Sequence, residues 1–193
     1  MTAIIILAAG SSSRLGRSKQ LLEYKNGSLL KHTIKAAVDS AVGPVIVVLG
    51  ANEKEIHSHI ETEPVTIVLN QNFSEGIASS IKTGLSYILD VHKDCENVIL
   101  MVCDQPFVNA KLLKNLVDVK QHTANLIVAC SYKDTIGVPA LFHKALFPEL
   151  LMLAGEEGGK KILLEHKDTV STIPFPSGEI DIDTSENYAA LQK

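Results

Sequence analysis

Short apolar runs alternate with longer amphipathic segments along most of the chain. Five runs are short and rich in β-branched residues, which is typical of buried parallel strands: Ala3–Leu7, Val45–Leu49, Val65–Leu69, Val98–Val102 and Leu126–Cys130. Three stretches between them repeat apolar residues with helical spacing: Leu29–Val42, Ile77–Leu89 and Leu112–Val117. This alternation predicts βαβ units and a mostly parallel sheet with helices on both faces.

The last third of the chain is less regular. Pro139 interrupts a strand-like run, Ile136–Phe142, which predicts an edge strand or a small β-insertion. Further on we predict a turn at Gly155–Gly159, a helix over Lys160–His166, antiparallel strands over Val170–Ile173 and Ile180–Ile182, and a last helix from Ser185. No linker or repeat interrupts the pattern, so residues 1–193 are expected to form a single α/β domain.

Composition excludes several classes of function. The formal net charge is −4 with scattered signs, so no basic stripe for nucleic acid is present. No apolar segment has the length of a membrane span, and the first residues read as a strand rather than a signal peptide. Cys95, Cys103 and Cys130 lack C-x-x-C spacing, which favours reduced thiols in the cytoplasm. On a helix His57 and His59 would point to nearly opposite faces, so surface histidines are favoured over a zinc site.

The most informative segment directly follows the first expected strand. Residues 7–19 read LAAGSSSRLGRSK, with three cations, Arg14, Arg17 and Lys19, among glycines and hydroxyls. Backbone N–H groups of small residues can surround a phosphate, and the cations can offset its charge. A basic surface loop is the alternative interpretation. The spacing matches neither a Walker loop nor the G-x-G-x-x-G dinucleotide motif, so we predict a phosphate site of another kind.

Polar residues follow the other expected strands at the same edge of the sheet. Asn52 lies just after the second strand, Asn70 ends the third, and Asp104 ends the fourth. Open α/β sheets bind ligands beyond the carboxyl ends of their strands. A carboxylate at such a strand end can bind a hard divalent cation such as Mg²⁺. Alternatively, Asp104 only begins the next turn.

Two more carboxylates alternate near the C-terminus. If Ile180 and Ile182 face inward on a strand, Asp181 and Asp183 share the opposite face. Neighbouring carboxylates repel unless a cation or donors lie between them, which favours a metal site. Asp183 or Thr184 could also be the N-cap of the last helix.

The first loop resembles LAAGxSxRxGxxK, the opening signature of the MobA-like nucleotidyltransferases, and its Ala-Ala-Gly form is most similar to the molybdenum cofactor cytidylyltransferases. Five later segments resemble motifs of this family in the same order: Asn70–Ser80, Asp104–Pro106, Gly137–Phe142, Gly155–Lys160 and Asp181–Asn187. The chain departs from the pattern at Ser185 and Asn187, where the family has Pro and Asp, and at Lys160, where the family has Arg. Lysine keeps the positive charge but loses the bidentate fork of arginine.

The resemblance implies a three-layer α/β/α nucleotidyltransferase (Rossmann-like) fold and transfer of CMP from CTP to the terminal phosphate of molybdenum cofactor, with release of pyrophosphate. It implies catalytic roles for Arg14, Lys19 and Asp104, Mg²⁺ bound by Asp104, Asp181 and Asp183, and nucleotide contacts from Leu7, Ala8, Ala9, Gly10, Ser11, Lys19, Asn70, Gly76 and Ser80. The implied partners are CTP or another nucleoside triphosphate, a molybdopterin acceptor and a molybdenum hydroxylase apo-enzyme. Two alternatives stay open: a sugar or polyol phosphate as acceptor, and a non-catalytic cofactor chaperone.

Overall fold

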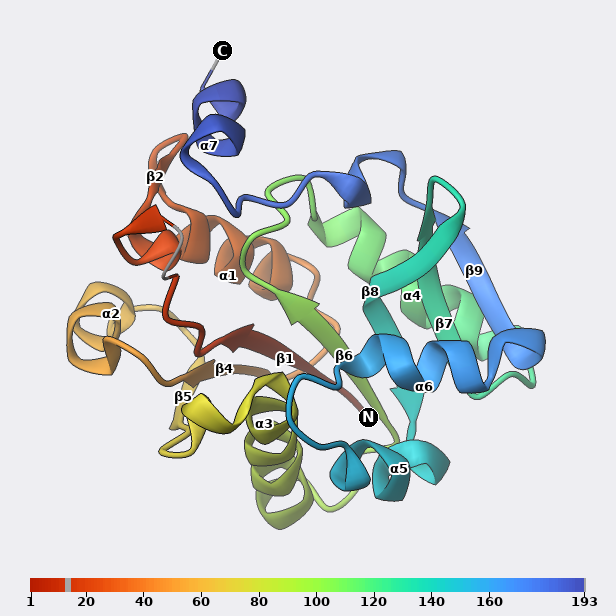
Figure 1. Cartoon of the computed structure of the whole chain (residues 1–193). Coiled ribbons are helices and arrows are strands. Elements are labelled where there is room, and N and C mark those ends of the chain that lie inside the picture. The colour runs from red at the N-terminus through yellow and green to blue at the C-terminus, as the bar shows by residue number, and fades with distance from the viewer. Residues whose placement is uncertain (13–14, 193) are drawn as a thin grey trace.

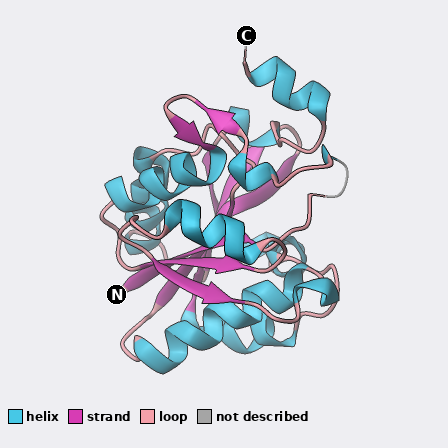
Figure 2. Cartoon of the chain, turned by 90° about the vertical axis from the view of Figure 1, so that its left-hand side faces the viewer, coloured by secondary structure: helices cyan, strands magenta, loops and turns pink. Residues whose placement is uncertain are grey.

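A seven-stranded sheet lies between two layers of helices (Figures 1 and 2). The computed structural model describes residues 1–12 and 15–192. Within them the strands follow the order β5-β4-β1-β6-β8-β7-β9, and every neighbouring pair is parallel except those of β8 with β6 and β7. The strands are β1 (Thr2–Ala8), β4 (Val45–Leu49), β5 (Thr66–Leu69), β6 (Asn97–Val102), β7 (Ile127–Tyr132), β8 (Thr135–His143) and β9 (Val170–Pro174). The expected α/β/α fold with a mostly parallel sheet is confirmed.

Each face of the sheet has its own hydrophobic core. Helices α1 (Leu29–Asp39), α2 (Glu53–Ile60) and α4 (Ala110–Gln121) cover one face, and α3 (Ile77–Val91), α5 (Phe147–Met152) and α6 (Gly159–Glu165) cover the other. Along β1, Ile4 and Ile6 belong to the α1 side, whereas Ala3 and Ile5 belong to the α3 side. A strand buried on both faces reads as an unbroken apolar run, which explains the signal in the sequence.

A small third hydrophobic cluster joins two segments that are far apart in the sequence. The hairpin of β2 (Glu23–Tyr24) and β3 (Gly27–Ser28) contributes Tyr24, and the C-terminal segment before and within α7 (Ser185–Leu191) contributes Ile182 and Tyr188. Figure 1 shows α7 beside β2. Thr184 Oγ1 accepts a hydrogen bond from Asn187 N (3.2 Å), and Asn187 Oδ1 accepts one from Thr184 N (3.2 Å). Thr184 is therefore the N-cap of α7, one of the two candidates.

Of the two alternatives around Pro139, the edge strand was wrong. Strand β8 lies inside the sheet, between β6 and β7. Its pairing with β7 shifts register so that Ala140 faces Ala129 and Gly137 faces Cys130, which leaves Pro139 in a bulge. The pairing with β6 ends at Ala140. Since a bulge leaves residues out of the ladder, the missing N–H of proline is tolerated here in an interior strand.

Two predictions near the C-terminus were also wrong. Strand β9 pairs with β7 in parallel, not antiparallel. Residues 180–182 form no strand: Ile182 is fully buried, whereas Ile180 is 41 % exposed. Alternating carboxylates therefore do not share a strand face, and the positions of Asp181 and Asp183 have another cause, given below.

Cys95, Cys103 and Cys130 are free and buried. Among the residues described, no helix has both the length and the apolar character needed to cross a membrane.

Candidate functional site

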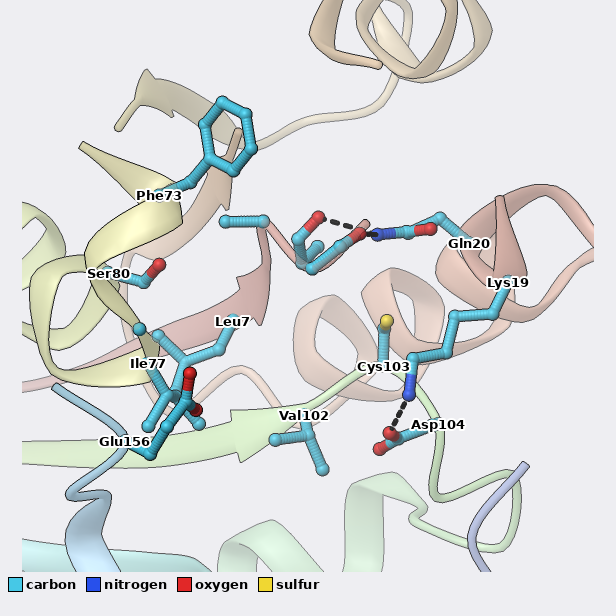
Figure 3. A pocket seen from close by; sticks show the side chains of 14 residues that line it. Leu7, Lys19, Gln20, Phe73, Ile77, Ser80, Val102, Cys103, Asp104 and Glu156 are labelled. Atoms are coloured by element: carbon cyan, nitrogen blue, oxygen red, sulfur yellow. Dashed lines mark hydrogen bonds and ion pairs between the residues drawn. The ribbon is translucent and has the colours of Figure 1, made fainter. Parts of the chain in front are cut away.

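A cavity of about 200 Å³ opens at the carboxyl ends of β1 and β6 (Figure 3). In Figure 3, Lys19 and Asp104 lie on one side of it, while Phe73, Ile77 and Ser80 lie on the other. Of the residues predicted from the sequence, eight line the cavity: Leu7, Ala8, Ala9, Gly10, Lys19, Gly76, Ser80 and Asp104. The expected edge of the sheet therefore carries the polar groups.

The loop after β1 is held by a residue that the sequence analysis missed. The buried Gln20 donates from Nε2 to the carbonyl oxygens of Ala8 (2.8 Å) and Gly10 (2.9 Å). Ala9 O accepts from Ala51 N (3.1 Å), and Ser12 Oγ accepts from Lys19 N (3.0 Å). Three successive carbonyls are thus occupied, which fixes the backbone that follows β1. No local sequence pattern marks Gln20, because its burial and its carbonyl partners exist only in the folded chain.

The opposite wall is the start of α3, supported from behind by Asn70. The buried Asn70 donates from Nδ2 to Ser79 Oγ (2.8 Å) and Ser80 Oγ (3.0 Å), and its Oδ1 accepts from Asn72 N (2.9 Å). Ser80 lines the cavity, whereas Asn70 does not. Asn70 therefore positions Ser80 in this structure, and its expected contact with nucleotide stays a prediction.

Gly76 lies at the N-cap of α3, where two constraints exclude a side chain. Its φ is +98°, and an added Cβ would lie 2.3 Å from the carbonyl oxygen of Gly155. The same carbonyl accepts a hydrogen bond from Ala78 N (3.1 Å). The loop that carries Glu156, another residue missed from the sequence, is thereby held against the cavity.

We expect Gly76→Ala to destabilise the fold by about 2–4 kcal/mol, because it combines a glycine-only backbone conformation with a backbone clash. Urea denaturation of both proteins measures the change. Gly10→Ala is the matched control, since an added Cβ there meets nothing within 4 Å, and it should cost less than about 1 kcal/mol. Equal stability of the two variants would contradict this role of Gly76.

The cluster of charges at the tip of β6 is the central feature of the site. Lys19 Nζ forms ion pairs with the Asp104 carboxylate and with Asp183 Oδ1 (2.9 Å). The side chains of Lys19 and Asp104 are 16 % and 17 % exposed. Burial alone would lower the pKa of Lys19, but the carboxylates of Asp104 and Asp183 raise its pKa above the ordinary value. Lys19 therefore stays protonated and bridges the two carboxylates.

Two hydrogen bonds bring the C-terminal carboxylates to this tip. Asp104 O accepts from Ile182 N (3.0 Å), and Gln105 donates from Nε2 to Gly178 O (2.8 Å). Gln105 is buried and was not singled out in the sequence. Because Ile182 lies between Asp181 and Asp183, its bond to Asp104 places both side chains near the strand end. Tertiary contacts, and not strand periodicity, thus account for their location.

Two buried side-chain oxygens at the tip, Asp104 Oδ1 and Gln105 Oε1, have no hydrogen-bond partner in the described part of the chain. Asp104 Oδ1 is inaccessible to solvent and accepts no hydrogen bond there. A buried unpaired carboxylate oxygen is unfavourable and indicates a missing cation or donor. Asp104 and Asp183 are hard oxygen ligands that suit a divalent cation. No group of three His, Cys, Asp or Glu residues in ligand geometry occurs among the described residues, so Asp181 as a third ligand stays a prediction.

Asp181 has a perturbed carboxyl group. Partial desolvation, together with the negative charges of Asp104 and Asp183, raises the pKa of Asp181 to about 6. In the unfolded chain an aspartate has a pKa near 3.9, so the folded state binds more protons between about pH 4 and pH 6. Stability attributable to Asp181 therefore falls as pH rises through this window.

We expect Asp181→Asn to raise the free energy of unfolding above pH 6 and to leave it unchanged below about pH 4, because the variant removes only the repulsion of the ionised form. Solvent screening reduces the gain to about 1 kcal/mol. Urea denaturation at pH 4 and pH 8 measures it. Asp168→Asn, an exposed aspartate outside the cluster, is the control and should show no such pH dependence. A gain at pH 4 equal to that at pH 8 would contradict the assignment.

Other predicted residues are placed less directly. Arg14 lies outside the described residues. Ser11 is exposed in the loop after β1, and Lys160 is exposed in the first turn of α6; neither lines the cavity. Their expected roles stay predictions.

Comparison with known proteins identifies the family. A model of the MobA-like NTP transferase domain matches residues 4–170. The chain belongs to this family. The match includes Lys19 and Asp104 and ends before Asp181 and Asp183. The nucleotidyltransferase class expected from the sequence is confirmed at this level.

Curated relatives of this MobA-like NTP transferase carry different names. It is 28 % identical to nicotine blue oxidoreductase of Paenarthrobacter nicotinovorans, over 97 % of this chain and 94 % of that protein. It is 25 % identical to the molybdenum cofactor cytidylyltransferase of Escherichia coli (100 % and 97 % covered) and to a probable molybdenum cofactor guanylyltransferase of Bacillus mycoides (98 % and 94 % covered). At this similarity the relatives do not distinguish one nucleotide from another.

Solved structures agree on the fold. Rv0371c from Mycobacterium tuberculosis superposes with a TM-score of 0.87 at 29 % identity, over 98 % of this chain and 96 % of that chain. A structure of Rv0371C in complex with manganese superposes with a TM-score of 0.80 at 26 % identity, over 98 % and 97 % of the two chains. Both structures share the fold of this MobA-like NTP transferase.

Proposed function

We propose that this protein transfers CMP from CTP to the terminal phosphate of a molybdopterin-type cofactor and releases pyrophosphate. The observation that carries the proposal is the convergence of the β1 loop, Lys19, Asp104 and Asp183 at one strand edge. An anion cradle beside two carboxylates fits a triphosphate with its metal. The cytidylyltransferase and guanylyltransferase among the relatives favour a molybdenum cofactor as acceptor.

The chemistry needs no protein nucleophile. An oxygen of the acceptor phosphate attacks the α-phosphorus of the nucleotide, a new P–O bond forms, and the bond from the α-phosphorus to the bridging oxygen of the β-phosphate breaks. Because an ionised phosphate is already nucleophilic, the protein contributes positioning and electrostatic stabilisation. Backbone N–H groups after Gly10 would hold the triphosphate, with Arg14 and Lys19 neutralising it.

Asp104 and Asp183 would hold Mg²⁺, with Asp181 as the third ligand. The unpaired Oδ1 of Asp104 supports this assignment, as does the manganese complex of the structural relative. When bound, such an ion neutralises phosphate charge in the transition state. Lys19 contributes a second positive charge that can reach the same phosphates. The apolar wall of Phe73 and Ile77 gives the cavity a surface on which a nucleobase can pack.

Pyrophosphate release tests the proposal. The assay pairs CTP, GTP, ATP and UTP, each with Mg²⁺, with molybdopterin, a sugar 1-phosphate and no acceptor. We expect turnover with CTP and molybdopterin. Turnover with the sugar phosphate alone would replace the acceptor, a preference for GTP would replace the donor, and cofactor binding without turnover would favour the chaperone.

The relative named nicotine blue oxidoreductase raises a second candidate, an oxidoreductase activity at the same site. The chain has no G-x-G-x-x-G motif, which leaves this candidate resting on similarity alone. Oxidation of NADH or NADPH in the presence of nicotine blue would measure it directly, and we expect none above the rate without protein.

A further inference from the structure

A second cavity lies on the α1 and α4 side of the sheet, away from α3. Its volume is about 660 Å³, compared with about 200 Å³ for the catalytic cavity, and it falls within the range of small-molecule sites. Its walls are α1, the β2–β3 hairpin and the start of α4, and we call it the α1–α4 groove. Four lysines line it: Lys25, Lys31, Lys35 and Lys111. The proposed reaction uses none of them.

The α1–α4 groove concentrates positive charge on a chain whose formal net charge is −4. Its lining contains a single carboxylate, Asp39, which pairs with Lys35 (2.9 Å). Lys31 lies 3.7 Å from Glu63. Lys25 and Lys111 have no ion-pair partner among the described residues, and Lys25 Nζ lies 5.0 Å from the centre of the Tyr24 ring. Unneutralised charge in a concave surface attracts anions.

The floor of the α1–α4 groove is apolar and aromatic. Ala36 and Val108 are buried there, and the Tyr24 and His32 rings meet edge to face with centroids 4.8 Å apart. His32 donates from Nε2 to Pro106 O (3.0 Å), which orients its ring. Burial and the charge of Lys25 lower the pKa of His32, so the positive charge of the groove comes from its lysines. Such a floor suits a planar ring, and the lysines suit an anion.

We propose that the α1–α4 groove binds a nucleotide-sized organic phosphate, with its ring on the apolar floor and its phosphate held by the lysines. This site is distinct from the catalytic cavity and does not depend on the proposed function. A single side chain, His32, connects the groove to the strand end that carries Asp104. His32 donates to the carbonyl oxygen of Pro106, which lies two residues after Asp104. A nucleotide and a phosphorylated non-nucleotide ring share the required chemistry.

Amide chemical shifts of the ¹⁵N-labelled full chain test the site residue by residue, without metal or turnover. The probes are CMP, phenyl phosphate, pyrophosphate and cytidine. We expect saturable shifts at Lys25, Lys31 and Lys111 with CMP or phenyl phosphate, and at least fivefold weaker binding of pyrophosphate and cytidine. CMP binding more tightly than phenyl phosphate assigns the groove to nucleotides, and equal binding assigns it to aromatic phosphates in general. Shifts at Gly10 and Ser80 report the catalytic cavity separately.

A pair of charge reversals on α4 separates the groove from general surface charge. Lys111→Glu should weaken CMP and phenyl phosphate binding in the groove at least fivefold, because it places a negative charge in the lining. Lys114→Glu, an exposed lysine one turn further along α4 and outside the groove, should leave binding unchanged. The proposal is overturned if the groove amides do not shift at millimolar probe, if pyrophosphate binds as tightly as CMP and phenyl phosphate, or if both variants weaken binding equally.

Discussion

Asp104→Asn should reduce metal-dependent pyrophosphate release at least a hundredfold while the protein stays folded. The substitution keeps the size of the side chain and the hydrogen bond from Ile182 N to the Asp104 carbonyl. It removes the charge that pairs with Lys19 and that would hold the divalent cation. Losing one preorganised electrostatic contact to a transition state typically costs about 2.7–4 kcal/mol, or a hundredfold to a thousandfold in rate.

Steady-state pyrophosphate release measures this loss, and circular dichroism with urea denaturation checks the fold. Asp118→Asn is the matched control, because Asp118 is exposed on α4 and lies outside both cavities. It should keep the wild-type rate. Wild-type turnover in Asp104→Asn would remove this carboxylate from the mechanism.

Lys19→Met should lower turnover at least a hundredfold and, in the absence of nucleotide, tighten the binding of a divalent cation at least tenfold. Lys19 Nζ bridges Asp104 and Asp183, so it occupies the negative potential that a metal would use. A unit charge about 4 Å away contributes about 1–4 kcal/mol in a partly solvated site. The metal must displace or share this ammonium unless a triphosphate offers the lysine another partner. Nucleotide and metal should therefore each strengthen binding of the other, by the same factor.

Calorimetric titration of Mn²⁺, with and without CTP, measures this coupling in wild type and Lys19→Met. We expect the factor by which CTP tightens Mn²⁺ binding to shrink in the variant. Lys54→Met, at an exposed position on α2, is the control and should leave both affinities unchanged. Mn²⁺ binding that is no tighter in Lys19→Met than in wild type would contradict the bridging role of the lysine.

The strands that sequence patterns located are those buried on both faces of the sheet. Strand β1 is an unbroken apolar run because its alternate residues enter two different cores. Strand β8 was predicted at an edge because proline has no N–H to donate to a neighbouring strand and is therefore rare in interior strands. At Pro139 a bulge interrupts the pairing, so that no donor is needed there. The direction of β9 is set by its neighbour β7, which local patterns do not encode.

The candidate site likewise contains residues that the sequence predicted and residues that it did not. Lys19 and Asp104 were predicted from loop chemistry and from the rule that ligands bind beyond the carboxyl ends of strands, both of which act over short stretches of chain. Gln20 and Gln105 were missed, because their hydrogen bonds go to backbone carbonyls whose positions exist only in the folded chain.

The sequence by itself determined the α/β class, the position of the glycine-rich loop after β1 and the acidic end of β6, because local periodicity and residue chemistry suffice for these features. Only the tertiary structure decided that Lys19 joins Asp104 to Asp183, residues 85 and 164 positions away from it. It also decided that four lysines from the hairpin, α1 and α4 line one groove. Such contacts depend on strand order and on how helices pack, and these follow from the energy of the whole chain rather than of any segment.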